Sequence, residues 1–292
     1  MEQINIKSAY KYCEKITQQN AKNFYYAFKL LPKPKRLAIY ATYAFCRICD
    51  DIVDSPGTSS NKIEKLKELQ STVENINHLK NPSPIFIALN DAISKFNIPL
   101  NYYLELLEGV ESDISRNRFS NFEELSKYCY QVASVVGLIC IEIFGYKNPD
   151  AKKYAIYLGY AMQITNILRD VKEDSKINRI YIPLNEIEKF DYSEVELIKS
   201  IKNKNFCLLM EHQAKRAQKY YFESRKLFPL INKDAKACTE IMHETYNRIL
   251  NRIIESDFNV FDRRIGISKF EKITILLKLW KKNIINKLMI LQ

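Results

Sequence analysis

The sequence has few of the residues on which turn-rich folds depend. Only 6 glycines and 9 prolines occur among 292 residues, too few for the many turns of an all-β fold. It contains no Gly-rich phosphate loop, zinc-finger spacing or RNA-binding signature. No uninterrupted apolar run approaches the ~18 residues that indicate a membrane span. These absences favour a helical protein that is soluble or peripheral to a membrane.

The formal net charge is +11 at pH 7. Such an excess suits a nucleic acid, an anionic membrane surface or a small polyanionic substrate, and charge alone does not choose among them. Because no nucleic-acid motif accompanies the charge, we expect no nucleic-acid partner. A pure binding module is therefore the weaker hypothesis.

Seven cysteines are scattered through helical-looking segments, and the start MEQINIKSAY has no apolar core of a secretory signal. We therefore expect a cytoplasmic protein without disulfides. Cys46 and Cys49 form a C-x-x-C, but no second pair follows at zinc-ribbon spacing and no βαβ pattern surrounds it. They are interpreted as small core side chains.

Proline and glycine clusters separate a succession of segments with helical periodicity. We predict an all-α, single-domain helical bundle over residues 1–292 with a central active-site cavity, in which the last helix, about 268–289, either packs on the bundle or is peripheral to it. The predicted helices span 3–18, 21–31, 34–54, 60–78, 84–95, 99–116, 121–145, 150–175, 204–227, 233–256 and 268–289. Segments 34–54 and 121–175 are apolar around much of their circumference, which is typical of central helices.

The first of these central helices carries a polar stripe. Tyr43, Arg47, Asp50 and Asp54 are spaced 4, 3 and 4 residues apart and so share one helix face. Two carboxylates on a largely apolar helix repel each other and need a cation. Magnesium, which takes one or two carboxylates together with substrate phosphates, fits this need.

A second stripe lies near the end of the predicted helix 150–175. Gln163, Asn166, Asp170 and Asp174 are spaced 3, 4 and 4 residues apart. One such acidic pair is most simply interpreted as a solvated helix surface, but two stripes on two unusually apolar helices are hard to explain that way. Facing each other across a bundle, they would hold magnesium ions and diphosphate groups, while apolar walls sheltered an allylic carbocation.

These motifs, in this order, resemble those of the squalene and phytoene synthases, which join two prenyl diphosphates head to head. The resemblance covers roughly residues 15–270. It is carried by Asn23–Phe28 with Leu30-Leu31-Pro32, by Tyr43–Asp54, by Tyr128–Ala133 with Gly137, and by Gln163–Asp174 followed by Arg179–Pro183.

The resemblance implies roles for individual residues. Two or three magnesium ions would bind with substrate, at Asp50 and Asp54 for one diphosphate and at Asn166, Asp170 and Asp174 for the other. The implied phosphate-side cations are Lys22, Arg47, Arg169, Arg179 and Arg264, and the implied hydroxyls near the diphosphates are those of Tyr43, Tyr181 and Tyr246. The implied prenyl-pocket residues are Phe24, Tyr128, Val132, Val136, Gly137, Ala155, Leu158 and Gln163. For Lys22 and Arg264, a solvated surface charge is an equal alternative.

One position departs from the family pattern. Many members have Ser-x-Ser before the Phe, whereas this chain has Ala21-Lys22-Asn23. Asn23 can still donate a hydrogen bond to a phosphate, but Ala21 cannot. We expect this change to affect affinity rather than reaction type.

Within the family, Phe24–Phe28 and the run Asp50–Gly57 are most similar to bacterial presqualene diphosphate synthases of squalene and hopanoid synthesis. The resemblance therefore implies that two farnesyl diphosphates give presqualene diphosphate, without NADPH. Phytoene synthase, acting on two geranylgeranyl diphosphates, and squalene or dehydrosqualene synthase are the alternatives. We expect a monomer or a weak dimer.

Two alternatives of other classes stay open. A terpene cyclase with the same metal chemistry would need one strong diphosphate site. A basic helical protein that binds membranes without catalysis would use the segment from Ile267, where apolar residues alternate with lysines at helical spacing. Packing of that helix on the bundle is its simpler interpretation, and peripheral association with the inner face of the membrane is the other.

Overall fold

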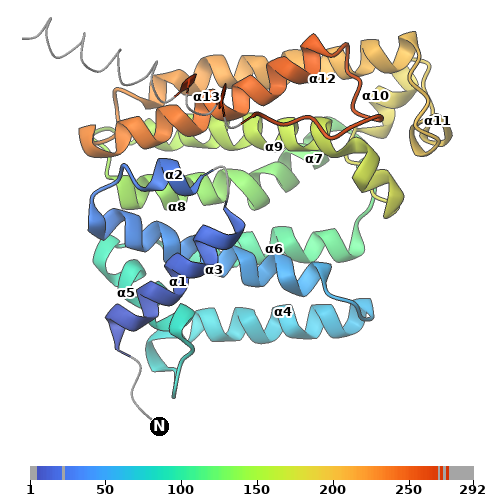
Figure 1. Cartoon of the computed structure of the whole chain (residues 1–292). Coiled ribbons are helices and arrows are strands. Elements are labelled where there is room, and N and C mark those ends of the chain that lie inside the picture. The colour runs from blue at the N-terminus through green and yellow to red at the C-terminus, as the bar shows by residue number, and fades with distance from the viewer. Residues whose placement is uncertain (1–4, 22–23, 269, 272–273, 276–292) are drawn as a thin grey trace, which may run out of the picture.

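Helices make up nearly all of the regular structure in the computed structural model, which describes residues 5–21, 24–268, 270–271 and 274–275. Figure 1 shows them stacked in layers, most with their axes close to parallel. Within the described residues there are no β-strands, only two isolated bridges. The predicted all-α class is confirmed.

The elements follow one another through short connections. They are α1 (Ile6–Asn20), α2 (Tyr25–Phe28), α3 (Lys33–Asp54), α4 (Ser59–Glu74), η1 (Ile76–His78), α5 (Pro84–Phe96), α6 (Leu100–Ser115), α7 (Phe122–Cys129), the π-helix η2 (Tyr130–Ser134), α8 (Val135–Phe144), α9 (Ala151–Lys176), α10 (Leu184–Lys189), α11 (Glu194–Ile198), α12 (Lys204–Ser224), η3 (Arg225–Leu227) and α13 (Lys233–Glu255).

Prolines set several helix starts. Pro34 occupies the first turn of α3 and Pro84 that of α5, where the missing N–H costs nothing because first-turn amides lack a helical acceptor. Pro99 precedes α6 as its N-cap. α3 ends at Asp54, after which Ser55 turns extended and Pro56-Gly57 follows.

Several predicted boundaries were wrong. The helix predicted over 21–31 is helical only at Tyr25–Phe28 among its described residues. No helix was predicted between 176 and 203, yet α10 and α11 form there, α11 with a capping box on Ser193. Most of the predicted helix 268–289 lies outside the described residues.

The predicted helix 121–145 is interrupted by the π-turn η2. Five residues of this segment line the central cavity at i,i+4 spacing: Tyr128, Val132, Val136, Cys140 and Phe144. In a regular α-helix each i,i+4 step rotates by about 40°, so four steps would move Phe144 by about 160°. The extra residue of a π-turn removes about 100° of that drift. The turn therefore keeps the wall facing one cavity.

Two glycines admit the π-turn between its neighbours. A Cβ on Gly109 of α6 would lie 2.6 Å from the Cβ of Gln131, and one on Gly159 of α9 would lie 2.4 Å from the Cα of Ser134. The Ser134 hydroxyl also donates to the Ile156 carbonyl at 2.9 Å. α6, η2 and α9 are therefore locked in register.

Phe122–Phe144 is also the one helical stretch in the described part of the chain that is long and apolar enough to cross a membrane, with a mean hydropathy of 1.4. We predicted no apolar segment of membrane length, because polar residues interrupt the apolar run within this stretch. Here the stretch packs against α6 and α9 and lines the cavity, as the core helix of a bundle does.

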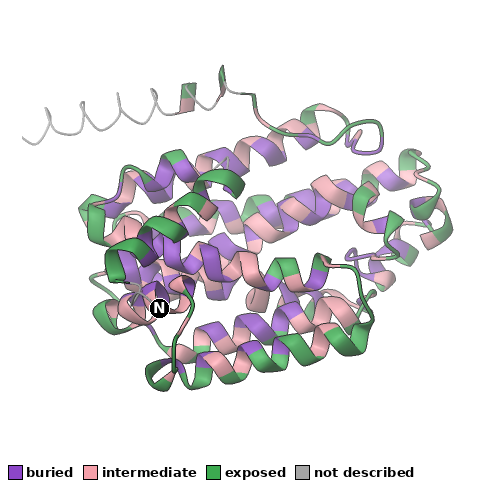
Figure 2. Cartoon of the chain, turned by 60° about the horizontal axis from the view of Figure 1, so that its bottom comes forward, coloured by how far each residue is buried: buried purple, intermediate pink, exposed green. Residues whose placement is uncertain are grey.

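The apolar interior forms two clusters. One gathers α1 to α6 and the other gathers α7 and α9 to α12, while α8 and α13 contribute buried residues to both. In Figure 2 the buried faces of the helices turn toward the interior and the exposed faces outward. All seven cysteines are free; of the two predicted to be core side chains, Cys49 is buried, whereas Cys46 is half-buried and lines the cavity. Phe24, Tyr102 and Tyr130 pack against both clusters, which meet around the cavity.

Candidate active site

A cavity of about 430 Å³ lies where the two apolar clusters meet. Helices α3, α6, α8, α9 and α13 and the π-turn form its walls. Twelve of the residues predicted for the site line it: Phe24, Tyr43, Asp50, Tyr128, Val132, Val136, Gly137, Ala155, Leu158, Gln163, Asn166 and Tyr246.

One end of the cavity, here called the floor, is apolar. Ile39 lies 11 residues before Asp50 on α3, a distance of about 16 Å along a helix. Thr239 likewise precedes Tyr246 by seven residues on α13. The floor is formed by Ile39, Ile141, Phe144, Leu227 and Thr239.

The other end, here called the mouth, is where α3, α6 and α9 terminate. Asp54 is the last residue of α3, Asp113 lies two residues before the end of α6, and Asp174 lies two residues before the end of α9. A carboxylate at a helix C-terminus opposes the helix dipole, which is stabilised there by cations. Three helices thus place acids where their own fields disfavour them.

The charges at the mouth act on one another. Burial, with the charges of Asp54 and Asp113 adding to it, raises the pKa of Asp50 to about 6, although the nearby Arg47 lowers it. The Asp50 side chain is open to the cavity yet surrounded by protein atoms, so water screens it incompletely. Burial and the charges of Asp170 and Asp113 raise the pKa of Asp174 to about 7. Asp113 therefore links the two predicted acidic pairs electrostatically.

Asp170 is held differently from the other acids. Its carboxylate accepts hydrogen bonds from Arg169 Nε at 2.8 Å and from Arg264 Nε and Nη2 at 2.7 and 3.0 Å. Burial acts to raise the pKa of Asp170, but these two guanidinium groups outweigh it and hold the pKa below its usual value. Without substrate, two predicted phosphate-binding cations thus bind a predicted metal ligand.

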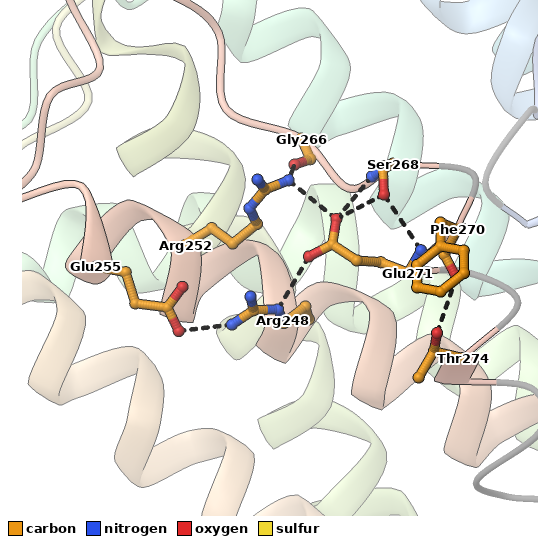
Figure 3. A network of polar contacts seen from close by, with 8 residues as sticks. All are labelled: Arg248, Arg252, Glu255, Gly266, Ser268, Phe270, Glu271 and Thr274. Atoms are coloured by element: carbon orange, nitrogen blue, oxygen red, sulfur yellow. Dashed lines mark hydrogen bonds and ion pairs between the residues drawn. The ribbon is translucent and has the colours of Figure 1, made fainter.

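A clamp on α13 anchors the segment that carries Arg264, as Figure 3 shows. Glu271 accepts from Arg248 Nε at 3.2 Å and from Arg252 Nη1 at 3.0 Å. Arg252 also donates to the carbonyl of Gly266 at 2.7 Å, two residues after Arg264. α13 therefore fixes the end of the segment that reaches over α9.

The remaining predicted residues of α3 and α13 border the same region. Arg47 forms an ion pair with the exposed Asp51 rather than with Asp50 or Asp54. Burial and the Asp50 charge raise the pKa of Tyr43 to about 12. The ring of Tyr246 stacks on that of Phe24 with centroids 5.4 Å apart.

Backbone pairing carries Arg179 and Tyr181 to the mouth. Asn178 after α9 adopts a left-handed conformation (φ 60°), which Asn tolerates better than most residues. The chain then runs beside the segment after α6, with Ile180 N–H donating to the Asn117 carbonyl at 2.9 Å. Arg179 Nη2 consequently donates to the main-chain oxygen of Asp113 at 2.9 Å, and the Tyr181 hydroxyl donates to its carboxylate at 2.8 Å.

Asn166 presents an oxygen without a partner. Its amide nitrogen donates to Gln163 Oε1 at 3.3 Å, whereas its Oδ1 is buried and accepts no hydrogen bond from the described residues. A buried carbonyl oxygen that lacks a donor is a ready ligand for a hard cation. The described residues contain no group of three His, Cys, Asp or Glu side chains placed to hold a metal alone. Magnesium binds few protein ligands and completes its shell with water and phosphate, so an isolated oxygen such as Asn166 Oδ1 is a ligand of the kind it takes.

The cavity and its mouth thus bring together every predicted site residue except two. Lys22 and Asn23 lie outside the described residues. Sequence reasoning missed Asp113, although a signal was present: Leu106, Val110 and Asp113 follow i, i+4, i+7 on α6, so an acid continues an apolar stripe. Fold and site together define an all-α protein whose cavity suits an apolar chain with an anionic head.

Comparison with known proteins identifies the class. Residues 17–271 match the family described as Squalene/phytoene synthase. Phytoene synthase of Arthrospira platensis is 34% identical over 281 residues, covering 92% of this chain and 91% of its own. Phytoene synthase of Mycobacterium tuberculosis is 34% identical over 270 residues, covering 91% and 89%.

Solved structures agree with this. A dehydrosqualene synthase in complex with ligand superposes with a TM-score of 0.87 at 31% identity, covering 95% of this chain and 97% of that one. Squalene synthase HpnC from Alicyclobacillus acidocaldarius gives 0.81 at 24% identity, covering 87% and 96%, which supports the fold alone. The chain belongs to the squalene/phytoene synthase family of prenyltransferases, whose substrates are prenyl diphosphates and whose reaction is head-to-head condensation.

Proposed function

We propose that this protein condenses two farnesyl diphosphates head to head into presqualene diphosphate, with magnesium and without NADPH. The observation that carries the proposal is the convergence of three acid-bearing helix C-termini on one end of an apolar cavity. Such a mouth needs cations, and magnesium with a diphosphate would meet that need.

The ligands we propose for magnesium are the carboxylates of Asp50, Asp54, Asp170 and Asp174 and the free Oδ1 of Asn166. Bound there, magnesium supplies charge neutralisation that turns a diphosphate into a leaving group. Asp170 must first give up Arg169 and Arg264, and both guanidinium groups are then free to bind phosphate oxygens.

The walls perform the rest of the chemistry we propose. The apolar residues between mouth and floor exclude water, so an allylic cation formed at the mouth is not quenched. Phe24 and Tyr128 line the cavity, and their aromatic rings are placed to stabilise that cation. The double bond of the second chain attacks it, and loss of a proton closes a cyclopropane that keeps one diphosphate.

The choice of product rests on the motifs Phe24–Phe28 and Asp50–Gly57. Phytoene synthesis from two geranylgeranyl diphosphates is the second candidate, because the curated relatives cited above are named phytoene synthases.

The deciding experiment is product analysis by mass spectrometry after incubating the purified chain and magnesium with farnesyl or geranylgeranyl diphosphate, each with and without NADPH. We expect presqualene diphosphate from farnesyl diphosphate under both conditions. Phytoene as the preferred product, or squalene formed only with NADPH, would replace the proposed product. A monocyclic or linear terpene from a single substrate molecule would overturn the head-to-head reaction itself.

A further inference from the structure

Asp113 holds two tyrosine hydroxyls at the edge of the cavity. Its Oδ1 accepts from Tyr181 at 2.8 Å and its Oδ2 from Tyr128 at 3.2 Å. Of the side chains that line the described cavity, only Asp50 and Asp113 are carboxylates. Asp50 belongs to the proposed metal site, which leaves Asp113 without an assigned task.

The two tyrosines are fixed by packing. The rings of Tyr128 and Tyr181 stack with centroids 5.2 Å apart, and Phe119 packs on both at 5.3 and 5.8 Å. Tyr128 and Tyr181 are both buried. The Asp113–Tyr128 pair is therefore rigid, and Tyr128 itself lines the cavity.

The charge of Asp113 is unfavourable for folding. An amide in the same place would accept from one hydroxyl through its oxygen and donate to the other through its NH2, without burying a charge beside the Asp54 carboxylate. Burial raises the pKa of Asp113, against the opposing effects of Tyr181, Arg179 and Tyr128. A carboxylate in such a place is a better proton acceptor than one in water.

We propose that Asp113 is a positioning residue that takes up, through the Tyr128 hydroxyl, the proton released when the cyclopropane ring closes. This inference rests on the proposed head-to-head reaction. After the two substrates join, a tertiary cation remains on the second prenyl chain. The cyclopropane ring closes when C1 of the first prenyl chain bonds to this cationic carbon.

The C1–H bond breaks and its electron pair forms the last carbon–carbon bond of the ring. The released proton forms a new O–H bond on Tyr128, while the former hydroxyl proton of Tyr128 passes to Asp113 Oδ2. The net result is a cyclopropane and a protonated Asp113.

The test compares Asp113→Asn with the unmodified chain, using the substrates that the unmodified chain couples. We expect formation of the cyclopropyl diphosphate to fall by roughly 10²–10⁴-fold, the usual contribution of general base catalysis. Diphosphate release should fall less, because ionisation of the first substrate precedes the proton step. Coupled acyclic products or alcohols should appear in place of the ring.

Substrate deuterated at C1 supplies a readout that a structural role would not move. If Asp113 serves the proton step, the kinetic isotope effect on ring formation rises in Asp113→Asn and in Tyr128→Phe, and the double variant loses little more than either single one. Tyr181→Phe removes the other hydrogen bond of Asp113 but leaves the Tyr128 pair. We expect its loss to be smaller and its isotope effect to match that of the unmodified chain.

Glu186→Gln is the matched control for removing a buried carboxylate. Glu186 is 8% exposed, pairs with Arg216 and Gln213, and does not line the cavity. It should lower the melting temperature without changing the product ratio or the isotope effect. Should Asp113→Asn fail to fold, Tyr128→Phe carries the test, because it deletes one oxygen and keeps the ring stack.

Two results overturn the inference alone: ring formation within about twofold of the unmodified chain, or equal losses of diphosphate release and ring formation with an unchanged isotope effect. An unmodified chain that forms no coupled product instead overturns the proposed function, and this inference with it. The product profile of the unmodified chain therefore separates the two failures.

Discussion

At its mouth the cavity is ringed by acids and guanidinium groups, whereas its floor is formed by apolar side chains and one threonine. The mouth opposes stability: carboxylates near the ends of α3, α6 and α9 oppose their helix dipoles, and burial together with neighbouring acids raises the pKa values of Asp50, Asp113 and Asp174. The floor and walls do the reverse, through close packing around α8 and the π-turn. The contrast separates residues that the fold needs from residues that only the chemistry needs.

The largest expected effect is at the mouth. Asp54→Asn should lower turnover by about 10³-fold, because several kcal/mol of charge stabilisation at the metal site is lost. The melting temperature should hardly change, since Asp54 is exposed and the substitution leaves no cavity. Steady-state kinetics and thermal unfolding of one preparation measure both. Asp51→Asn is the control: Asp51 lies on the same helix, pairs with Arg47 and is absent from the cavity lining. Equal losses in both variants would contradict the proposed metal site.

The wall should behave in the opposite way. Gly159→Ala would place a Cβ 2.4 Å from the backbone of Ser134, and overpacking of this kind costs about 1–3 kcal/mol. We expect a lower melting temperature, with the turnover of the folded fraction changing far less than in Asp54→Asn. Gly266→Ala is the control, because a Cβ there meets nothing within 4 Å. Equal melting temperatures for the two alanine variants would show that the backbone of the π-turn shifts at little cost in stability and would contradict this prediction.

The floor should control chain length. Thr239 is 4% exposed and lines the cavity, so Thr239→Phe fills space at the end remote from the acids. We expect the ratio of kcat/KM for farnesyl over geranylgeranyl diphosphate to rise by roughly 10–100-fold, a range typical of steric discrimination in apolar pockets. Thr239→Val keeps the bulk and serves as the control. A uniform loss with both substrates would mean that the chains do not reach this floor.

The smallest expected effect concerns stability and pH at the mouth. The folded protein holds the Asp174 proton up to a pH of about 7, whereas the unfolded chain releases it near ~3.9. Between these values the folded state binds more protons, so this group makes stability fall as pH rises. Asp174→Asn should therefore stabilise the metal-free protein by on the order of 1 kcal/mol at pH 8, after allowing for solvent screening, and by nothing at pH 3.5.

Urea unfolding at the two pH values measures this difference. Glu173→Gln is the neighbouring control, since Glu173 is exposed. If Asp174→Asn instead lowered the free energy of unfolding at pH 8, neighbouring groups would be shown to stabilise the Asp174 carboxylate rather than to destabilise it.

Sequence reasoning found the parts of the mouth that repeat along a helix. Asp50 with Asp54 and Asp170 with Asp174 are i,i+4 pairs on apolar helices, and that pattern is visible without coordinates. Asp113 has no acidic partner four residues away, so only its place on an apolar stripe could have indicated it. Helix class was likewise accessible from the scarcity of glycine and proline and from the 3.6-residue periodicity.

What sequence reasoning missed depends on contacts between distant segments. The two hydrogen bonds from Arg264 to Asp170 join residues 94 positions apart, and no local sequence pattern indicates them. α10 and α11 are too short for periodicity to register. The π-turn arises because Gly109 and Gly159 on neighbouring helices leave room for it.

The π-turn ties the orientation of the cavity wall to the number of residues in this stretch. If Tyr130–Ser134 relaxed into a regular α-helix with all its residues kept, everything after it would rotate by about 100° relative to Tyr128. Val136, Cys140 and Phe144 would then leave the cavity surface together. A one-residue deletion that also removed the π-turn would instead keep these side chains on the cavity side, so relatives without the π-turn should be one residue shorter in this stretch.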